Sequence, residues 1–162
     1  MLIVLFEHKA WCNARLVEAL RAAPPEADRK TLAIALYTFD HTARVDQIFR
    51  ARLEGDEPAV DAIVADRRPQ LDVLAAEMAE TDAWYLDYVR SASPEALQSA
   101  ESFTFISDGE PGCMTRAQML AHVIAHGASH RGAIGQMLDS IGVRGAPDMV
   151  TTSISGRYAA AR

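Results

Sequence analysis

The sequence predicts an all-α protein that folds as one up-down-up-down four-helix bundle, with a small hairpin or loop before the last helix. The 162 residues, 49% of them hydrophobic, are enough to fill a single core. Only 9 Gly and 7 Pro occur, beside many Ala, Leu, Arg and Glu residues, which lose little side-chain freedom in a helix. Four runs of apolar residues at helical spacing follow one another, each bounded by residues that end helices.

The first two predicted helices occupy the first third of the chain. Apolar residues recur at helical spacing over residues 2–20, and Pro24-Pro25 cannot continue the helix. A second periodic run spans residues 29–53 and stops at Gly55, which favours the end of a helix. We expect these two helices to be antiparallel neighbours.

The third predicted helix begins near Pro69, a favourable first-turn residue, and runs to about Ser91. A short turn of helix should follow at Ser93-Pro94-Glu95. Between residues 102 and 114 the apolar residues alternate with polar ones, and Asp108-Gly109 tolerate the positive φ of a tight turn. This segment is therefore predicted to be a small hairpin or an extended loop at one end of the bundle.

The fourth predicted helix starts at a capping box formed by Thr115 and Gln118, in which side chains satisfy the first free backbone groups. It continues to about Ile141 and ends at Gly142. Residues 143–162 are rich in Gly, Ser and Thr with little periodicity. The whole chain, 1–162, is thus expected to be a single domain with a loosely ordered C-terminal tail over 143–162.

Charge and composition exclude several classes of protein. The net charge of −6 and the absence of a basic patch argue against nucleic acid as a partner. No apolar run approaches the roughly 20 residues of a membrane span, and the start of the chain lacks the features of a signal peptide. We therefore expect a cytoplasmic protein without a membrane partner. Cys12 and Cys113 form no CxxC pair and are interpreted as two reduced thiols.

The histidines are the most informative side chains, because all five lie in predicted helices. His122, His126 and His130 recur every fourth residue and so project from one face of the last helix. Residues four apart are separated by about 6 Å along the axis, which two imidazoles can close on one ion, whereas eight apart is about 12 Å. Only two of the three can therefore share a metal, and the spacing leaves both neighbouring pairs possible.

A third ligand must come from another helix, and His41 is the best placed. It lies on a stripe of the second helix that is expected to face the core: Ile34, Tyr37, His41, Val45 and Ile48. An imidazole buried there needs a partner, and ligation between facing helices is one solution known in bundles. His8 is instead expected beside Trp11 at the end of the bundle. Gly127 and Gly132 lie inside the last helix and indicate either close approach of a neighbour or room for a ligand.

The sequence resembles the DinB/YfiT-like family of metal-dependent proteins. The strongest match is the segment from His126 to Gly132, HGASHRG, followed by Ile134 and Leu138, which is similar to the family signature HxxxHRGQI. Shorter similarities extend the resemblance over nearly the whole chain: Trp11-Cys12-Asn13-Ala14, Asp40-His41, Asp108-Gly109, Gly142-Val143 and Pro147-Asp148. Ala133 stands where the family usually has Gln, and the tail differs from the usual apolar ending.

The resemblance implies that His41, His126 and His130 are the metal ligands. The cofactor would be a divalent ion such as Zn, Ni or Fe, together with a low-molecular-weight thiol in the relatives that are thiol-dependent transferases or isomerases. Arg131 is the residue we expect to hold the carboxylate of such a thiol. The implied function is activation of a thiol or of water for transfer to, or hydrolysis of, a small-molecule substrate.

Two other interpretations remain open at the level of sequence. One is a non-catalytic metal-binding stress-response protein, in which the ion stabilises the bundle or reports metal supply. The other is a DNA-damage effector, which the family name suggests but the acidic charge opposes.

We also expect a homodimer, because apolar residues surround much of the first helix: Leu2, Ile3, Leu5 and Phe6.

Overall fold

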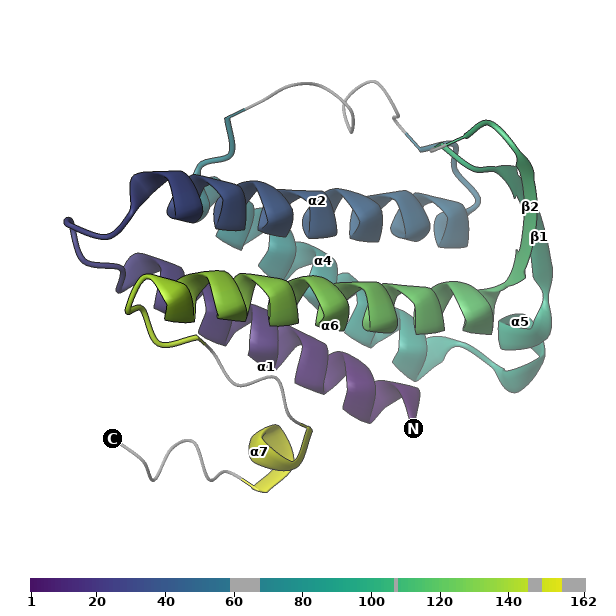
Figure 1. Cartoon of the computed structure of the whole chain (residues 1–162). Coiled ribbons are helices and arrows are strands. Elements are labelled where there is room, and N and C mark those ends of the chain that lie inside the picture. The colour runs from purple at the N-terminus through teal and green to yellow at the C-terminus, as the bar shows by residue number, and fades with distance from the viewer. Residues whose placement is uncertain (59–67, 107, 146–149, 156–162) are drawn as a thin grey trace.

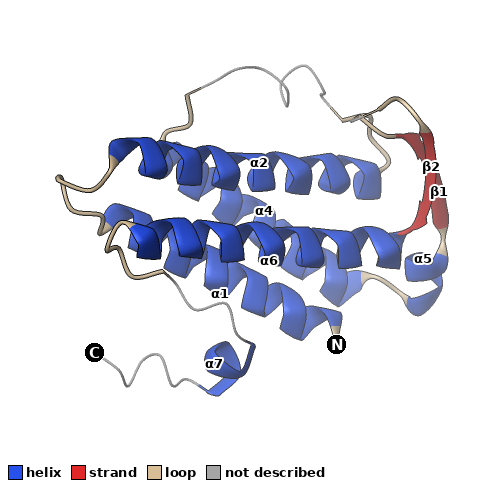
Figure 2. Cartoon of the chain, viewed as in Figure 1, coloured by secondary structure: helices blue, strands red, loops and turns tan. Residues whose placement is uncertain are grey.

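The computed structural model of the chain describes residues 1–58, 68–106, 108–145 and 150–155 (Figure 1). In this part the protein is mostly helical with one small two-stranded sheet, as Figure 2 shows, and this agrees with the predicted all-α class. The elements, in chain order, are α1 (Leu2–Arg21), α2 (Arg29–Glu54), α4 (Leu71–Ser91), α5 (Pro94–Gln98), β1 (Ala100–Thr104), β2 (Pro111–Thr115), α6 (Arg116–Ser140) and α7 (Val150–Ser155).

The ends of the long helices follow the local signals in the sequence. Asp28 caps α2 by accepting a hydrogen bond from the backbone N–H of Thr31 at 2.9 Å, and α2 ends at Gly55 with a φ of 85°. The predicted capping box of α6 is confirmed, because the Thr115 and Gln118 side chains each accept a hydrogen bond from the other residue's backbone N–H.

Residues 102–114 are predicted to form a small hairpin or an extended loop, and the structure has a hairpin between α5 and α6. β1 and β2 pair in antiparallel register, with Ala100 opposite Thr115 and Thr104 opposite Pro111. The hairpin lies across one end of the long helices (Figure 2). The Arg52 guanidinium, near the end of α2, lies 4.2 Å from the ring centroid of Phe103 and attaches β1 to this end of the helices.

The direction of each helix follows from contacts at its ends. Arg21 pairs with Asp72 at 2.7 Å and Arg90 with Glu7 at 3.4 Å, so the end of α1 lies beside the start of α4 and the two helices are antiparallel. In the same way α2 and α6 are antiparallel, because Arg116 at the start of α6 donates a hydrogen bond to the backbone carbonyl oxygen of Leu53 near the end of α2.

By contrast, α2 and α4 run in the same direction. Arg50 pairs with Glu80 at 3.2 Å, and Asp40 and Leu74, which lie earlier in α2 and in α4 respectively, line the same small cleft. The order of directions is therefore up-down-down-up, and the predicted up-down-up-down order is wrong. Apolar periodicity does not determine helix direction, and residues 55–70, fully extended, could span about 50 Å, more than the roughly 32 Å length of α4.

The expected neighbours also differ from the observed ones. The main packing partners of α1 are α4 and α6, and those of α2 are α6 and α4. The two helices α1 and α2 run in opposite directions, as expected, but they lie diagonally across the core instead of side by side. Figure 1 shows α2 and α6 next to each other, which is the pair that carries the candidate metal ligands.

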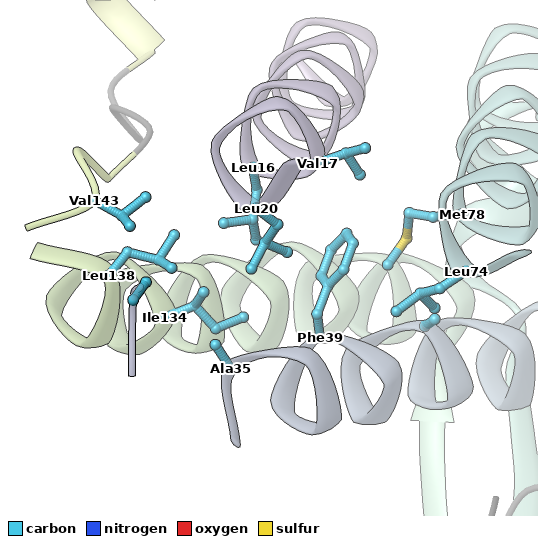
Figure 3. Close-up of a cluster of buried hydrophobic side chains, with 12 residues drawn as sticks. Leu16, Val17, Leu20, Ala35, Phe39, Leu74, Met78, Ile134, Leu138 and Val143 are labelled. Atoms are coloured by element: carbon cyan, nitrogen blue, oxygen red, sulfur yellow. The ribbon is translucent and has the colours of Figure 1, made fainter. Parts of the chain in front are cut away.

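Buried apolar side chains form two clusters at opposite ends of the long helices. Figure 3 shows the first, which receives residues from all four long helices, including Leu16, Phe39, Met78 and Ile134. The second lies towards the β-hairpin and includes Phe6 and Tyr85, whose rings stack at 5.0 Å. Together they supply the apolar burial that stabilises the fold.

A buried layer of charged side chains lies among these apolar residues. Lys9, 1% exposed, pairs with Asp46 at 2.7 Å and also contacts Asp82, so a single ammonium joins α1 to α2 and α4. Burial alone would lower the pKa of Lys9, but the two carboxylates outweigh it and the pKa is raised. Burial raises the pKa of Asp46 to about 6 despite the opposing effect of Lys9. At neutral pH the layer therefore contains ionised groups that depend on one another.

The C-terminal segment packs against α1. Within the region predicted as a tail, Val150–Ser155 form α7, and the Ser153 hydroxyl lies 3.0 Å from Nδ1 of His8. The predicted Pro147-Asp148 similarity falls outside the described residues. Among the helices that the structure describes, none has both the length and the apolar character required to cross a membrane.

Candidate metal centre

Three imidazoles converge between α2 and α6. The Nε2 atom of His126 lies 3.3 Å from Nε2 of His41 and 3.1 Å from Nε2 of His130. One ligand atom from each of the three side chains can be chosen so that all lie within 4.8 Å of one another. The structure thus brings together the three histidines that the family resemblance implied, and this group could hold a metal ion.

His41 does not face the core, although that expectation was the reason for selecting it as the third ligand. The first part of the stripe thought to face the core instead lies on the outside of α2, where Ile34 is 46% and Tyr37 44% exposed and His41 itself is exposed, while the later Val45 and Ile48 are half-buried. The buried face of α2 carries other residues: Ala35, Phe39, Thr42, Ala43, Asp46, Phe49 and Leu53. The candidate metal centre is therefore open to solvent and is not embedded in the core.

Each histidine is followed by a residue that points inward. Thr42, Gly127 and Arg131 come directly after the three histidines, and all three are buried. This alternation follows from helical geometry, which turns consecutive side chains by about 100°. The outer faces of α2 and α6 carry the imidazoles, while their inner faces meet directly beneath.

The local environment favours the neutral form of two of the three imidazoles, His41 and His126. Burial, and to a smaller extent the nearby His130, His41 and His122, together lower the pKa of His126 to about 4. The pKa of His41 is lowered by burial, by His130 and by Arg44, against an opposing effect of Asp40. A neutral imidazole is the form that ligates metals.

The donor set fits a divalent metal ion. Ligand nitrogens held at about 2.0–2.1 Å from a tetrahedral zinc lie roughly 3.3 Å apart, close to the two Nε2 separations seen here. Without a shared cation, neighbouring neutral imidazoles in this group could be joined only by N–H···N hydrogen bonds, with one proton between each pair of nitrogens. Nδ1 of His126 is buried and has no hydrogen-bond partner in the described part of the chain, whereas metal-ligating histidines usually have such an outer partner.

The remaining histidines and the cysteines lie outside this group. The His122 ring packs on Phe49 at 4.8 Å and on His126 at 5.4 Å between centroids. His8 lies near Trp11, as expected, with 6.3 Å between the ring centroids. The Cys12 thiol is buried, with its Sγ 3.4 Å from Nε2 of His8, and the Cys113 thiol is exposed on β2.

Arg131 does not line the open side of the histidine group. Its side chain is buried, and Nη1 donates a hydrogen bond to Oδ1 of Asn13 on α1 at 3.2 Å. Asn13 in turn donates to Asp82 at 2.8 Å, which connects Arg131 to the buried charged layer. Sequence reasoning did not predict this layer, although its signal was present, since polar residues interrupt the apolar stripes of α1, α2 and α4 near the middle of each helix.

Two of the three glycines of α6, Gly127 and Gly132, have different surroundings, which predicts different effects of Ala. A Cβ at Gly132 would meet no atom within 4 Å, whereas a Cβ at Gly127 would lie 3.0 Å from Nη1 of Arg131. We expect Gly132→Ala to stabilise the protein by about 0.5–1 kcal/mol, because Ala loses less backbone entropy in a helix. Gly127→Ala should gain less or destabilise, because it displaces a guanidinium that Asn13 holds. Thermal unfolding followed by circular dichroism measures both, and equal gains would contradict the close approach of Arg131 to Gly127.

Comparison with known proteins supports one relationship. The sequence model described as "DinB family" matches residues 1–155, which is most of the chain. No curated protein matches significantly. No solved structure does so either.

Proposed function

The chain belongs to the DinB family, and from this premise we propose that His41, His126 and His130 bind one divalent metal ion that serves an enzymatic reaction. The reaction we propose is the activation of a low-molecular-weight thiol, or of water, for transfer to or hydrolysis of a small molecule. The observation that carries the proposal is the convergence of three Nε2 atoms at 3.1 and 3.3 Å on an open face.

Three histidine ligands suit a catalytic site better than a structural one. Structural zinc sites are closed by four protein ligands, whereas catalytic sites keep a position for water or substrate. A bound divalent ion would lower the pKa of a coordinated thiol or water and so supply a nucleophile near neutral pH. The exposure of His41 leaves space on this side for a small molecule to reach the ion.

The scaffold that we propose for this site is a four-helix bundle. In it, α2 and α6 supply the ligands, while α1 and α4 complete the core on the other side. Such bundles place metal ligands on facing helices, where the backbone is rigid.

The surface next to the site favours a substrate with an apolar part. Tyr37 and Ile34 lie four and seven residues before His41, on the same face of α2, and both are exposed. On α6 the face of His126 and His130 continues to Ala133, a small residue where the family usually has Gln. If one end of the substrate bound the metal, an apolar group at its other end could contact Tyr37 and Ile34 without breaking an ion pair, because neither side chain is charged.

Cobalt substitution tests whether the proposed site takes a thiol. Titration of the cobalt-loaded protein with 2-mercaptoethanol or cysteine should produce a sulfur-to-metal charge-transfer band, because a thiol that enters an open position binds as the thiolate. His130→Ala should abolish the band, while His122→Ala should keep it.

The alternative is a non-catalytic metal-binding stress-response protein. It would be favoured if no thiol perturbs the cobalt spectrum and if metal removal lowers the melting temperature strongly without loss of any measurable reaction. Both results together would contradict the catalytic proposal.

We also propose that the protein forms a homodimer through the start of α1. Of the residues first considered, Phe6 belongs to the core, but Ile3 is 38% exposed, and it lies beside Val4 at 41% and Met1 at 96%. Apolar side chains exposed together in this way favour burial against a second copy. Light scattering should give twice the chain mass of 17.7 kDa, and Ile3→Glu should shift the protein to a monomer. A monomeric wild-type protein at high concentration would contradict this proposal.

A further inference from the structure

Resting on the proposed metal site, we propose that Arg131 is a positioning residue, which fixes the rotation of α6 so that His126 and His130 face His41. This assigns to Arg131 a role inside the protein, in place of contact with a substrate carboxylate. The inference is carried by a continuous path of buried contacts from the metal-bearing face of α6 to the three other long helices.

The first step of this path lies directly beneath the histidines. A Cβ at Gly127 would lie 3.0 Å from Nη1 of Arg131 and 3.9 Å from Cγ2 of Thr42, so these three residues meet on the inner faces of α2 and α6. Each of them follows one of the three histidines in sequence. Any rotation of α6 that moved the Arg131 guanidinium would also move His126 and His130 relative to His41.

The second step fixes the guanidinium itself. Nη1 of Arg131 donates to Oδ1 of Asn13 at 3.2 Å, and the Asn13 amide nitrogen donates to Oδ2 of Asp82 at 2.8 Å. The other carboxylate oxygen of Asp82 accepts from Lys9, which also pairs with Asp46 of α2 at 2.7 Å. Arg131 is thus held by α1, and through α1 by α4 and α2.

This geometry matters most for His126, because its ring lacks an outer hydrogen-bond partner among the described residues. Metal-ligating histidines usually have an outer hydrogen-bond partner that fixes the ring. Nδ1 of His126 has none among the described residues. The orientation of this ring must therefore come from the placement of α6 and from its packing, and the Arg131 contacts supply the polar part of that placement.

Competition titrations with zinc and cobalt test the inference on the full chain. Arg131→Met removes the donors and keeps much of the side-chain length, and we expect it to weaken zinc binding by about 10–100-fold, the range found when outer contacts of metal ligands are lost. The visible spectrum of bound cobalt should also change, because the nitrogens no longer converge in the same way. Arg131→Lys should restore part of the affinity, since it can still donate to Asn13.

Leu138→Ala is the matched control for a general loss of stability. Leu138 is fully buried in the same helix, two turns beyond His130, and outside the polar path. We expect this variant to melt at a lower temperature and yet to bind zinc and cobalt as the wild-type protein does. If Arg131→Met does not fold, Asn13→Ala should show the same loss of affinity in weaker form, because it keeps the guanidinium but removes its acceptor and the hydrogen bond from Asn13 to Asp82.

Three results would overturn the inference. One is zinc binding by Arg131→Met equal to that of the wild-type protein. Another is loss of affinity in Leu138→Ala in the same proportion to its lowered melting temperature, which would mean that only stability is involved. The last is unchanged zinc affinity with selective loss of binding of carboxylate-bearing thiols, which would return Arg131 to the substrate. A wild-type protein that binds neither metal would instead overturn the proposed function.

Discussion

Replacing His126 with Ala should abolish stoichiometric metal binding, and His41→Ala and His130→Ala should each weaken it severely. His126 is the central member of the group, because its Nε2 atom is within 3.3 Å of the Nε2 atoms of both others. Loss of a ligand should cost more than the ~10–100-fold in affinity that accompanies loss of an outer contact. Elemental analysis of the purified variants, followed by zinc competition, measures the effect.

His122→Ala is the control for this experiment. His122 lies on the same face of α6 and stacks on His126, so its removal alters the surroundings of the site without removing a ligand. It should retain the metal content of the wild-type protein. Stoichiometric metal in His41→Ala would contradict the proposed ligand set, since α6 alone would then be sufficient.

Replacing Lys9 with Met should produce the largest loss of stability of any conservative substitution that we consider. The Lys9 ammonium is the counter-ion of two buried carboxylates, Asp46 and Asp82, on two other helices. Removing one member of a buried ion pair typically costs about 3–5 kcal/mol, because the remaining charge is left uncompensated. For a chain of this size that corresponds to a fall in melting temperature of roughly 10 °C.

Lys30→Met provides a matched control, because Lys30 is the only other lysine in the chain and is exposed at the start of α2. The two variants lose the same charge, so a similar fall in both would mean that net charge, and not the buried pair, is responsible. The pH dependence of the destabilisation by Lys9→Met offers a second measurement. Because the pKa of Asp46 is raised above its ordinary 3.8, the destabilisation grows as the pH rises and this carboxyl ionises in the folded protein. Lys9→Met should therefore be less damaging at pH 5 than at pH 7.

Local signals predicted the elements of the fold well. The ends of α2 and α6 depend on Asp28, Gly55, Thr115 and Gln118, whose effects on the backbone involve only a few adjacent residues. The hairpin was predicted for the same reason, from alternation and turn residues. The metal-ligand set came from the family resemblance, because four-residue spacing alone could not choose between His122 and His130 as the partner of His126.

The orientation of α2 was predicted wrongly for a physical reason. Its true inner face contains Thr42 and Asp46, which made that face look polar, while the outer stripe from Ile34 to Ile48 looked apolar enough to be buried. Asp46 is tolerated inside only because Lys9 reaches it from α1. A pattern read within one helix cannot reveal a counter-ion that lies 37 positions away in the sequence and on another helix.

The parallel arrangement of α2 and α4 has a consequence for how the chain reaches its native state. The helices that pack most extensively are α1 with α4 and α2 with α6, and each of these pairs is separated in sequence by at least one other long helix. No early helical hairpin can therefore complete a native core by itself, and closing the long loops costs entropy before the contacts form. On the ribosome the N-terminal half would remain without its partners until α6 has emerged, so folding should be late, slow and all-or-none compared with that of a bundle whose successive helices are neighbours.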